Sequence, residues 1–220
     1  NGQVCQANAA HIPAFDRNFL YGDGIYEIIA AVNQRLIDIR AHLARLRQAA
    51  AEVDIVLPWT DEFLLFEMEH LLDLSQLPFA SIRLIVSRGV GEALIPLKEL
   101  QAARYIYCNE VPPPPEKIED GALRLKLRRL EGHHRGGQIK STNYLPNALV
   151  IMEAKDHGAD NGIFIDARGM VGESSNMNVA FVTPDRVLRH PAFDAILTGI
   201  TVQRILQLVP EPKRTARLVV

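Results

Sequence analysis

Two hydrophobic spacings alternate along the first 111 residues of the chain. Apolar residues recur every third or fourth position in two segments, which predicts amphipathic helices at 42–53 and 61–74. Other segments are short and rich in β-branched residues, and Asn33-Gln34 between two of them indicates a hairpin. The predicted strands are 25–32, 35–39, 80–89 and 103–111.

Four consecutive prolines interrupt this pattern within the segment 112–121. Proline fixes its φ angle and has no N–H to donate, so neither a helix nor a sheet continues through the run. We therefore expect an N-terminal α+β domain over 1–111, a Pro-rich linker over 112–121 and a C-terminal domain over 122–220.

The residues after the linker again mix the two spacings. They predict a strand at 122–130, a helix at 141–158, strands near 162–166 and 177–182, and a last helix from about Thr201. Strands and helices in both halves predict an α+β fold, with two domains around a cleft.

Charge and cysteine content narrow the class of protein. The 24 basic and 26 acidic residues nearly cancel, to a net charge of −2, and no long run of one sign occurs. Nucleic acid and anionic membranes are therefore poor partners. Cys5 and Cys108 lie far apart without CxxC spacing, which favours a reducing compartment and no metal site. With no apolar run of transmembrane length and no signal-peptide pattern, we expect a soluble cytoplasmic protein.

Two residues of the second half are candidates for chemistry on a small molecule. Lys140 lies between a glycine-rich turn and a predicted helix, and residues 141–143 are good helix-capping types. Such a lysine is either a solvated surface residue or an amine near a buried site, where it can act as a nucleophile or base. Glu173 ends a predicted strand after the turn at Gly169. Its carboxylate either holds the N–H of a ring nitrogen or is a solvated loop acid.

Two further features suit a phosphate group. The sequence Thr198-Gly199-Ile200-Thr201 enters an apolar helix, whose first N–H groups lack intrahelical partners and attract anions; an ordinary capped helix is the alternative. Arg45 has a planar fork that fits a phosphate dianion, or it is a surface salt-bridge partner. An amine, a carboxylate for a ring nitrogen, a phosphate seat and an arginine are the parts needed to hold pyridoxal phosphate.

The order and spacing of these motifs resemble a known family from about residue 15 to residue 206. The pieces are "FDRNFLYGDGIYEII" (15–29), "HLARL" (42–46), "SRG" (87–89), "IKSTNYLPNAL" (139–149), "GMVGESSNMNVAFV" (169–182) and "LTGIT" (197–201). They resemble the fold-type IV pyridoxal-phosphate enzymes, the class IV aminotransferase family. That family contains branched-chain aminotransferases, D-amino-acid aminotransferases and aminodeoxychorismate lyases. The segments "KSTNYLPN" and "NMNVAFV" are most similar to the last two.

The resemblance implies roles for the cofactor-binding residues. Lys140 would bond the aldehyde of pyridoxal 5′-phosphate and then move a proton between the substrate Cα and the cofactor, which requires a neutral amine in a buried site. Glu173 would keep the pyridine nitrogen protonated. Arg45, Ile200 and Thr201 would bind the phosphate.

Three more residues take roles from the same resemblance. Tyr144 would reach the phenolic oxygen of the cofactor, and Tyr26 would help to receive the substrate carboxylate. For both tyrosines, packing in a core is the alternative. Arg88 would line the entrance of the site, or it is structural.

Two departures from the family pattern affect these expectations. Many relatives carry an arginine for the substrate carboxylate a few residues beyond "RG", where this chain has Ala93. One of His133, His134 and Arg135 could replace that arginine; a solvated basic loop is the alternative. The chain also stops soon after the last predicted helix, so we expect the C-terminal domain to lack its C-terminal end.

The resemblance implies an aminotransferase. It would move an amino group between an amino acid, of the D-amino-acid or branched-chain type, and a 2-oxo acid. An aminodeoxychorismate lyase, which forms 4-aminobenzoate and pyruvate, is the alternative, and a non-catalytic protein that binds pyridoxal phosphate is a remote one. A homodimer is expected, because relatives complete the substrate pocket with residues of the partner chain.

Overall fold

The structure, a computed structural model, describes residues 2–95, 100–114, 139–165, 169–193 and 196–209, and the backbone of 125–129 and 214–215. The contacts of the chain divide it into two units. The first unit is Asn1–Glu116 with Lys140–Asn143, and the second is Lys117–Ile139 with Tyr144–Val220. The predicted linker, 112–121, lies outside the described residues from 115 onward.

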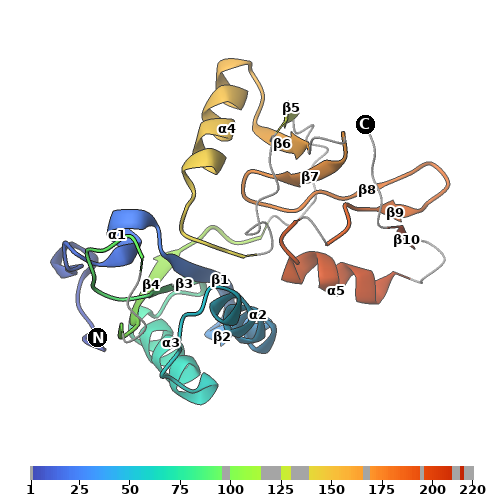
Figure 1. The fold of residues 1–220 in the computed structure, drawn as a ribbon. Coiled ribbons are helices and arrows are strands. Elements are labelled where there is room, and N and C mark those ends of the chain that lie inside the picture. Colours follow the sequence, from blue (N-terminus) through green and yellow to red (C-terminus); the bar gives the residue numbers. More distant parts are fainter. Residues whose placement is uncertain are drawn as a thin grey trace. The chain divides into compact units, whose positions relative to one another are not determined.

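The first unit contains a four-stranded antiparallel sheet (Figure 1). Its order is β2 (Arg35–Leu36), β1 (Gly24–Val32), β3 (Phe79–Ser87) and β4 (Ala103–Glu110). Asn33 and Gln34 both have positive φ, 47° and 64°, as expected for the two-residue turn of a tight hairpin. The hairpin and the strand positions predicted from the sequence are therefore confirmed here, apart from the length of β2.

Two helices, α2 (Ile39–Glu52) and α3 (Asp61–Ser75), pack on one face of this sheet. Strand residues of alternating position meet the apolar stripes of the helices, as period-2 and period-3.6 patterns require. This core consists of Ile25, Ile29, Ala31, Leu43, Leu46, Leu64, Met68, Leu72, Ala80, Ile82, Leu84 and Val86. Two short helices, η1 (Ala7–Ala9) and α1 (Arg17–Tyr21), precede β1.

The second unit has two small sheets (Figure 1). In one, β6 (Asn161–Ile165) pairs in parallel with β5 (Leu125–Arg129) and antiparallel with β7 (Val171–Ser174). In the other, β9 (Leu188–Arg189) lies between β8 (Phe181–Val182) and β10 (Arg214–Thr215). Helix α4 (Leu145–Asp156) contacts β5 and β6, and α5 (Ile200–Leu208) follows β9.

Several predicted boundaries are wrong. The strand predicted near 177–182 is a strand only at Phe181–Val182, and the helix predicted at 42–53 is Ile39–Glu52. The segment 35–39 is a strand only at Arg35–Leu36, because Asp38 adopts a left-handed conformation, with φ 49°, and turns the chain into α2 at Ile39. The helix predicted at 141–158 begins at Leu145, because residues 141–143 are used in the first unit.

The buried face of α4 is not the one that its large apolar residues mark. Leu145, Leu149 and Met152 recur at helical spacing but are exposed, and the buried residues of the helix are Val150 and Ala154. In the part of the chain that is described, no helix combines the length and the hydropathy needed to cross a membrane.

Candidate functional site

The backbone of Lys140 is hydrogen-bonded to the edge of β1. The N–H of Tyr26 donates to the carbonyl of Lys140 at 2.9 Å, and the N–H of Thr142 donates to the carbonyl of Gly24 at 3.0 Å. Ile25 and Ser141 face each other across this short antiparallel bridge. Residues 140–142 therefore act as a strand fragment on the first unit, although the sequence assigned them to the second domain.

The side chain of Lys140 lies against the ring of Tyr26. Its Nζ is 4.6 Å from the ring centroid, and the guanidinium carbon of Arg83 is 5.5 Å from the same centroid. Both distances suit cation–π contact. Tyr26 is only 7% exposed, so the structure brings together a half-buried amine, a buried aromatic ring and a second cation.

Thr142 and Asn143 fasten this segment to the loop before β1. The Thr142 hydroxyl is within hydrogen-bond distance of the Gly22 and Gly24 carbonyls, at 3.0 and 3.2 Å, and of Asn18 Oδ1. The Asn143 amide donates to the Gly22 carbonyl at 3.2 Å. Gly22 has φ 64°, and a Cβ there would lie 2.1 Å from Asn143 Oδ1. These residues are therefore tertiary anchors of the lysine and not the cap of α4.

Arg45 forms a buried ion pair with Glu27, the neighbour of Tyr26. Its Nε and Nη2 donate to the two carboxylate oxygens at 2.7 and 2.6 Å, and His42 Nδ1 lies 2.7 Å from Glu27 Oε2. Burial alone would raise the pKa of Glu27, which is 1% exposed, but hydrogen bonds and charge from Arg45 and His42 hold that pKa below its ordinary value. Arg45 thus has the salt-bridge role that the sequence left open, inside the molecule and not on its surface. Its phosphate role stays a prediction.

Arg88 joins the end of β3 to two loops. Its Nε donates to both oxygens of Asp23, at 3.0 and 2.8 Å, and its two other nitrogens donate to the carbonyls of Asp54 and Val53. Asp23 also accepts from Arg17 Nε at 2.7 Å. Burial raises the pKa of Asp23, but its bonds to the two arginines lower that pKa overall. These contacts support the structural role of Arg88.

The segment where relatives place a carboxylate-binding arginine is held by its backbone. Arg17 donates through Nη1 to the Ala93 carbonyl and through Nη2 to the Leu94 carbonyl, the latter at 2.9 Å. The Tyr21 hydroxyl donates to the Glu92 carbonyl. Ala93 itself is exposed. The proposed replacements, His133, His134 and Arg135, lie outside the described residues.

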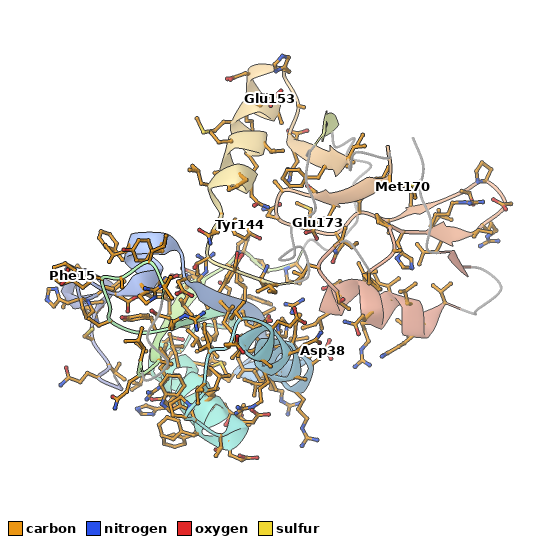
Figure 2. All side chains as sticks on the ribbon, viewed as in Figure 1. Phe15, Asp38, Tyr144, Glu153, Met170 and Glu173 are labelled. Carbon is orange, nitrogen blue, oxygen red and sulfur yellow. The ribbon has the colours of Figure 1, made fainter. Side chains whose placement is uncertain are left out.

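Glu173 and the start of α5 are linked by Asn178 in the second unit. Glu173 lies on β7 (Figure 2), and Asn178 Nδ2 donates to its Oε2 at 3.2 Å. The same nitrogen donates to the Leu197 carbonyl at 2.9 Å, three residues before α5 begins at Ile200. The structure therefore brings the predicted ring-nitrogen acid and the predicted phosphate seat together through a residue that sequence reasoning missed.

The remaining predicted residues lie at helix starts. Ile200 and Thr201 are the first two residues of α5, whose N-cap, Gly199, has no side chain to satisfy the first-turn N–H groups. Tyr144 precedes α4 (Figure 2), and its carbonyl accepts the first helical bond, from Ala148.

Arg83 is the other residue that the sequence reading overlooked. A signal was present, because strict alternation along β3 and its pairing with β1 put Arg83 and Tyr26 on the same face of the sheet. For Asn178 the only signal was its position in the "NMNVAFV" segment.

Comparison with known proteins gives a consistent result. The family model of "Amino-transferase class IV" matches residues 24–216. The chain is 32% identical over 214 residues to the "Putative branched-chain-amino-acid aminotransferase" of Methanocaldococcus jannaschii, covering 96% of this chain and 74% of the relative. It is 29% identical over 219 residues to the D-alanine aminotransferase of Bacillus licheniformis, with the same two coverages. The fold matches the branched-chain amino acid aminotransferase of Escherichia coli with a TM-score of 0.87, at 22% identity, over 100% of this chain and 76% of that one.

The ion pair of Glu27 predicts a specific pH dependence. Because its folded-state pKa lies below 4.5, the stabilisation by Glu27 is complete above that value and is lost as the pH falls through the folded-state pKa. We expect Glu27→Gln to lower the free energy of unfolding by about 3 kcal/mol or more at pH 7, since Arg45 stays buried with a neutral partner. The difference from the unmodified protein should shrink toward pH 3 in urea titrations.

Glu52→Gln is the matched control, since Glu52 is an exposed acid at the end of α2, the helix that carries Arg45. It should leave the free energy of unfolding almost unchanged. A deficit of Glu27→Gln that stays constant from pH 7 to pH 3 would contradict the assignment of the buried charge.

Proposed function

This chain belongs to the class IV aminotransferases, which are pyridoxal-phosphate-dependent enzymes, and from that premise we propose which residues perform the transfer and which substrates they take. We propose that the amino donor is a D-amino acid of the alanine type or a branched-chain amino acid, and that the acceptor is a 2-oxo acid. The names of the two relatives support these donor classes.

The single observation that carries this proposal is the attachment of Lys140 to β1. The carbonyl of Lys140 accepts from Tyr26, so the start of the side chain is fixed while its amine lies over the Tyr26 ring. A fixed, half-buried amine fits an aldehyde, a carboxylate fits a protonated ring nitrogen, and a helix start with a glycine N-cap fits a phosphate. The donor set of this chain therefore suits pyridoxal phosphate.

We assign each step to residues of this chain. When bound, pyridoxal phosphate supplies a protonated ring that withdraws electrons from the substrate Cα. Lys140 would hold the aldehyde, and once the substrate amine displaces it from that carbon, its freed amine would carry the proton taken from Cα. Glu173 accepts the N–H of the ring nitrogen and keeps the proton there. The first turn of α5, at Ile200 and Thr201, binds the phosphate together with Arg45.

We further propose that Arg83 binds the substrate carboxylate, with Tyr26 beside it. The usual arginine is replaced by Ala93, whereas Arg83 contacts the same aromatic ring as the Lys140 amine. A guanidinium can hold a carboxylate with two parallel hydrogen bonds, which fixes the orientation of Cα. Tyr144 is assigned to the phenolic oxygen of the cofactor, and Arg88 to the structure around the entrance.

A homodimer in the cytoplasm completes the proposal. Exposed apolar side chains occur on α1, on the residues just before it and on the segment 90–95. Arg17 of α1 donates to the Leu94 carbonyl, and the Gly91 N–H donates to the carbonyl of Phe15, just before α1. The exposed apolar residues are Ile12, Phe15, Phe19, Val90, Leu94 and Ile95. An apolar surface of this kind suits a second copy of the chain. The two cysteines are free, which fits a reducing compartment.

Lys140→Ala should abolish both transfer and covalent retention of the cofactor. After incubation with pyridoxal phosphate and borohydride reduction, peptide mapping of the unmodified protein should find the label on Lys140. Lys155→Ala, which removes an exposed lysine of α4, should keep label and activity. An unlabelled Lys140 would overturn the mechanism. Label without any amino transfer, but with pyruvate release from aminodeoxychorismate, would identify the lyase instead.

Arg83→Ala should raise the KM of the amino donor with a smaller effect on kcat. Loss of a charge-assisted contact corresponds to about 10-fold to 100-fold in KM. Donors are first found by screening D- and L-alanine, valine and leucine with 2-oxoglutarate. Arg35→Ala, in the exposed hairpin, is the control and should leave KM unchanged. A donor KM unaffected by Arg83→Ala would exclude this residue from carboxylate binding.

Phe19→Asp should convert the dimer to a monomer, because it places a charge on this apolar surface; Phe19 is 71% exposed in the single chain. Light scattering after size exclusion measures the mass. Val56→Asp, at a residue 77% exposed on another loop, should leave the dimer intact. Equal masses for Phe19→Asp and the unmodified protein would show that this surface is not the interface.

A further inference from the structure

Both hydrogens of the Asn178 amide are used, and their acceptors belong to two different parts of the proposed cofactor site. One acceptor is Glu173 Oε2 on β7, and the other is the Leu197 carbonyl in the approach to α5. A planar amide with two fixed acceptors has little freedom to rotate. The position of the Glu173 carboxylate is therefore coupled to the position of the helix start.

The amide oxygen of Asn178 explains why residue 199 is a glycine. This residue has φ −69° and ψ 129°, a conformation open to any amino acid, so the backbone does not require a glycine there. Space does: a Cβ on Gly199 would lie 1.6 Å from Asn178 Oδ1. Asn178 thus packs directly on the N-cap of α5, and the two residues depend on each other.

The backbone that carries Asn178 is held independently. A tight turn precedes it, in which the Ser174 N–H donates to the Met177 carbonyl at 2.9 Å. Asn161 accepts from the Ser175 hydroxyl, and Asn147 of α4 donates to the Ser175 carbonyl. Because the turn is anchored on this other side, the Asn178 amide is presented in one place.

We propose that Asn178 is a positioning residue that fixes the spacing between the acid at 173 and the phosphate-binding turn of α5. This inference rests on the proposed function. The ring nitrogen and the phosphate of pyridoxal phosphate are joined by a rigid ring and one short arm, so the protein groups that receive them must keep a matching separation. If this separation is already fixed before binding, the cofactor does not have to order the two loops, and binding is stronger by that amount.

The test measures cofactor affinity and not turnover. Apoprotein is titrated separately with pyridoxal phosphate, with pyridoxal and with inorganic phosphate. We expect Asn178→Ala to raise the Kd of pyridoxal phosphate about 10-fold or more, as for loss of a bond to a charged acceptor. Both fragments should also bind more weakly, because Asn178 serves both contacts. Glu173→Ala, by contrast, should weaken the binding of pyridoxal and leave the binding of inorganic phosphate unchanged.

Asn178→Asp separates positioning from general packing. It keeps the size of the side chain but puts an ionised acceptor against Glu173 and the Leu197 carbonyl, so its Kd should exceed that of Asn178→Ala. Asn161→Ala is the control for a loosened turn, since it removes the bond to Ser175 without touching either acceptor of Asn178. It should lower the free energy of unfolding but change the Kd of pyridoxal phosphate less than Asn178→Ala does. If Asn178→Ala does not fold, Asn178→Ser, which retains one donor, takes its place.

A double-mutant cycle tests the contact with Gly199. Gly199→Ala should weaken cofactor binding strongly alone and less in the Asn178→Ala background, where the atom it strikes is gone. Unmodified protein that binds the cofactor on Lys140, with the same Kd after Asn178→Ala, would overturn this inference and leave the proposed function standing. Unmodified protein that binds no pyridoxal phosphate would instead overturn the proposed function.

Discussion

Two backbone hydrogen bonds determine where the Lys140 amine can lie. They join residues 140 and 142 to Tyr26 and Gly24 at the start of β1, on the edge that β2 occupies at the other end of the same strand. Backbone pairing is insensitive to side-chain identity, so it fixes the Cα of Lys140 as firmly as a residue of the sheet. The side chain then needs only to lie along the ring of Tyr26, whose own position is set by β1.

Charged groups around this edge hold a helix and loops against β1. Glu27 fastens α2 to the inner face of β1 through Arg45 and His42, and Asp23 gathers Arg17 and Arg88 beside the entry to the strand. Asp23 has arginine partners from two segments and Glu27 has Arg45 on α2, and these arginines compensate the burial of the two carboxylates. The opposite face of β1 carries Tyr26, whose ring contacts Lys140 and Arg83, the two cations to which the proposed function assigns roles.

Local sequence patterns were sufficient to predict most helices and strands of the first unit and to identify the residues of the family motifs. The α3 helix and strands β1, β3 and β4 lie within two residues of their predicted bounds, because their apolar periodicity is strong. The predictions that failed depended on contacts between residues far apart in the chain. Capping types at 141–143 predicted a helix start, but Gly22 and Gly24 were better partners for Thr142 and Asn143. No local pattern announces that Asn178 bridges Glu173 and Leu197, since the bridge depends on how β7 and α5 fold back on each other.

The assignment of residues 140–143 to the first unit means that the chain passes between its two units three times. A single cut therefore cannot release two halves that each keep all their native contacts. A fragment ending at residue 116 would carry β1 with Gly24–Tyr26 stripped of the short antiparallel bridge, and an open strand edge of that kind invites pairing with other chains. The complementary fragment would keep the lysine but lose the sheet that aims it. Evolutionary shuffling or laboratory splitting of this fold must accordingly move both units together.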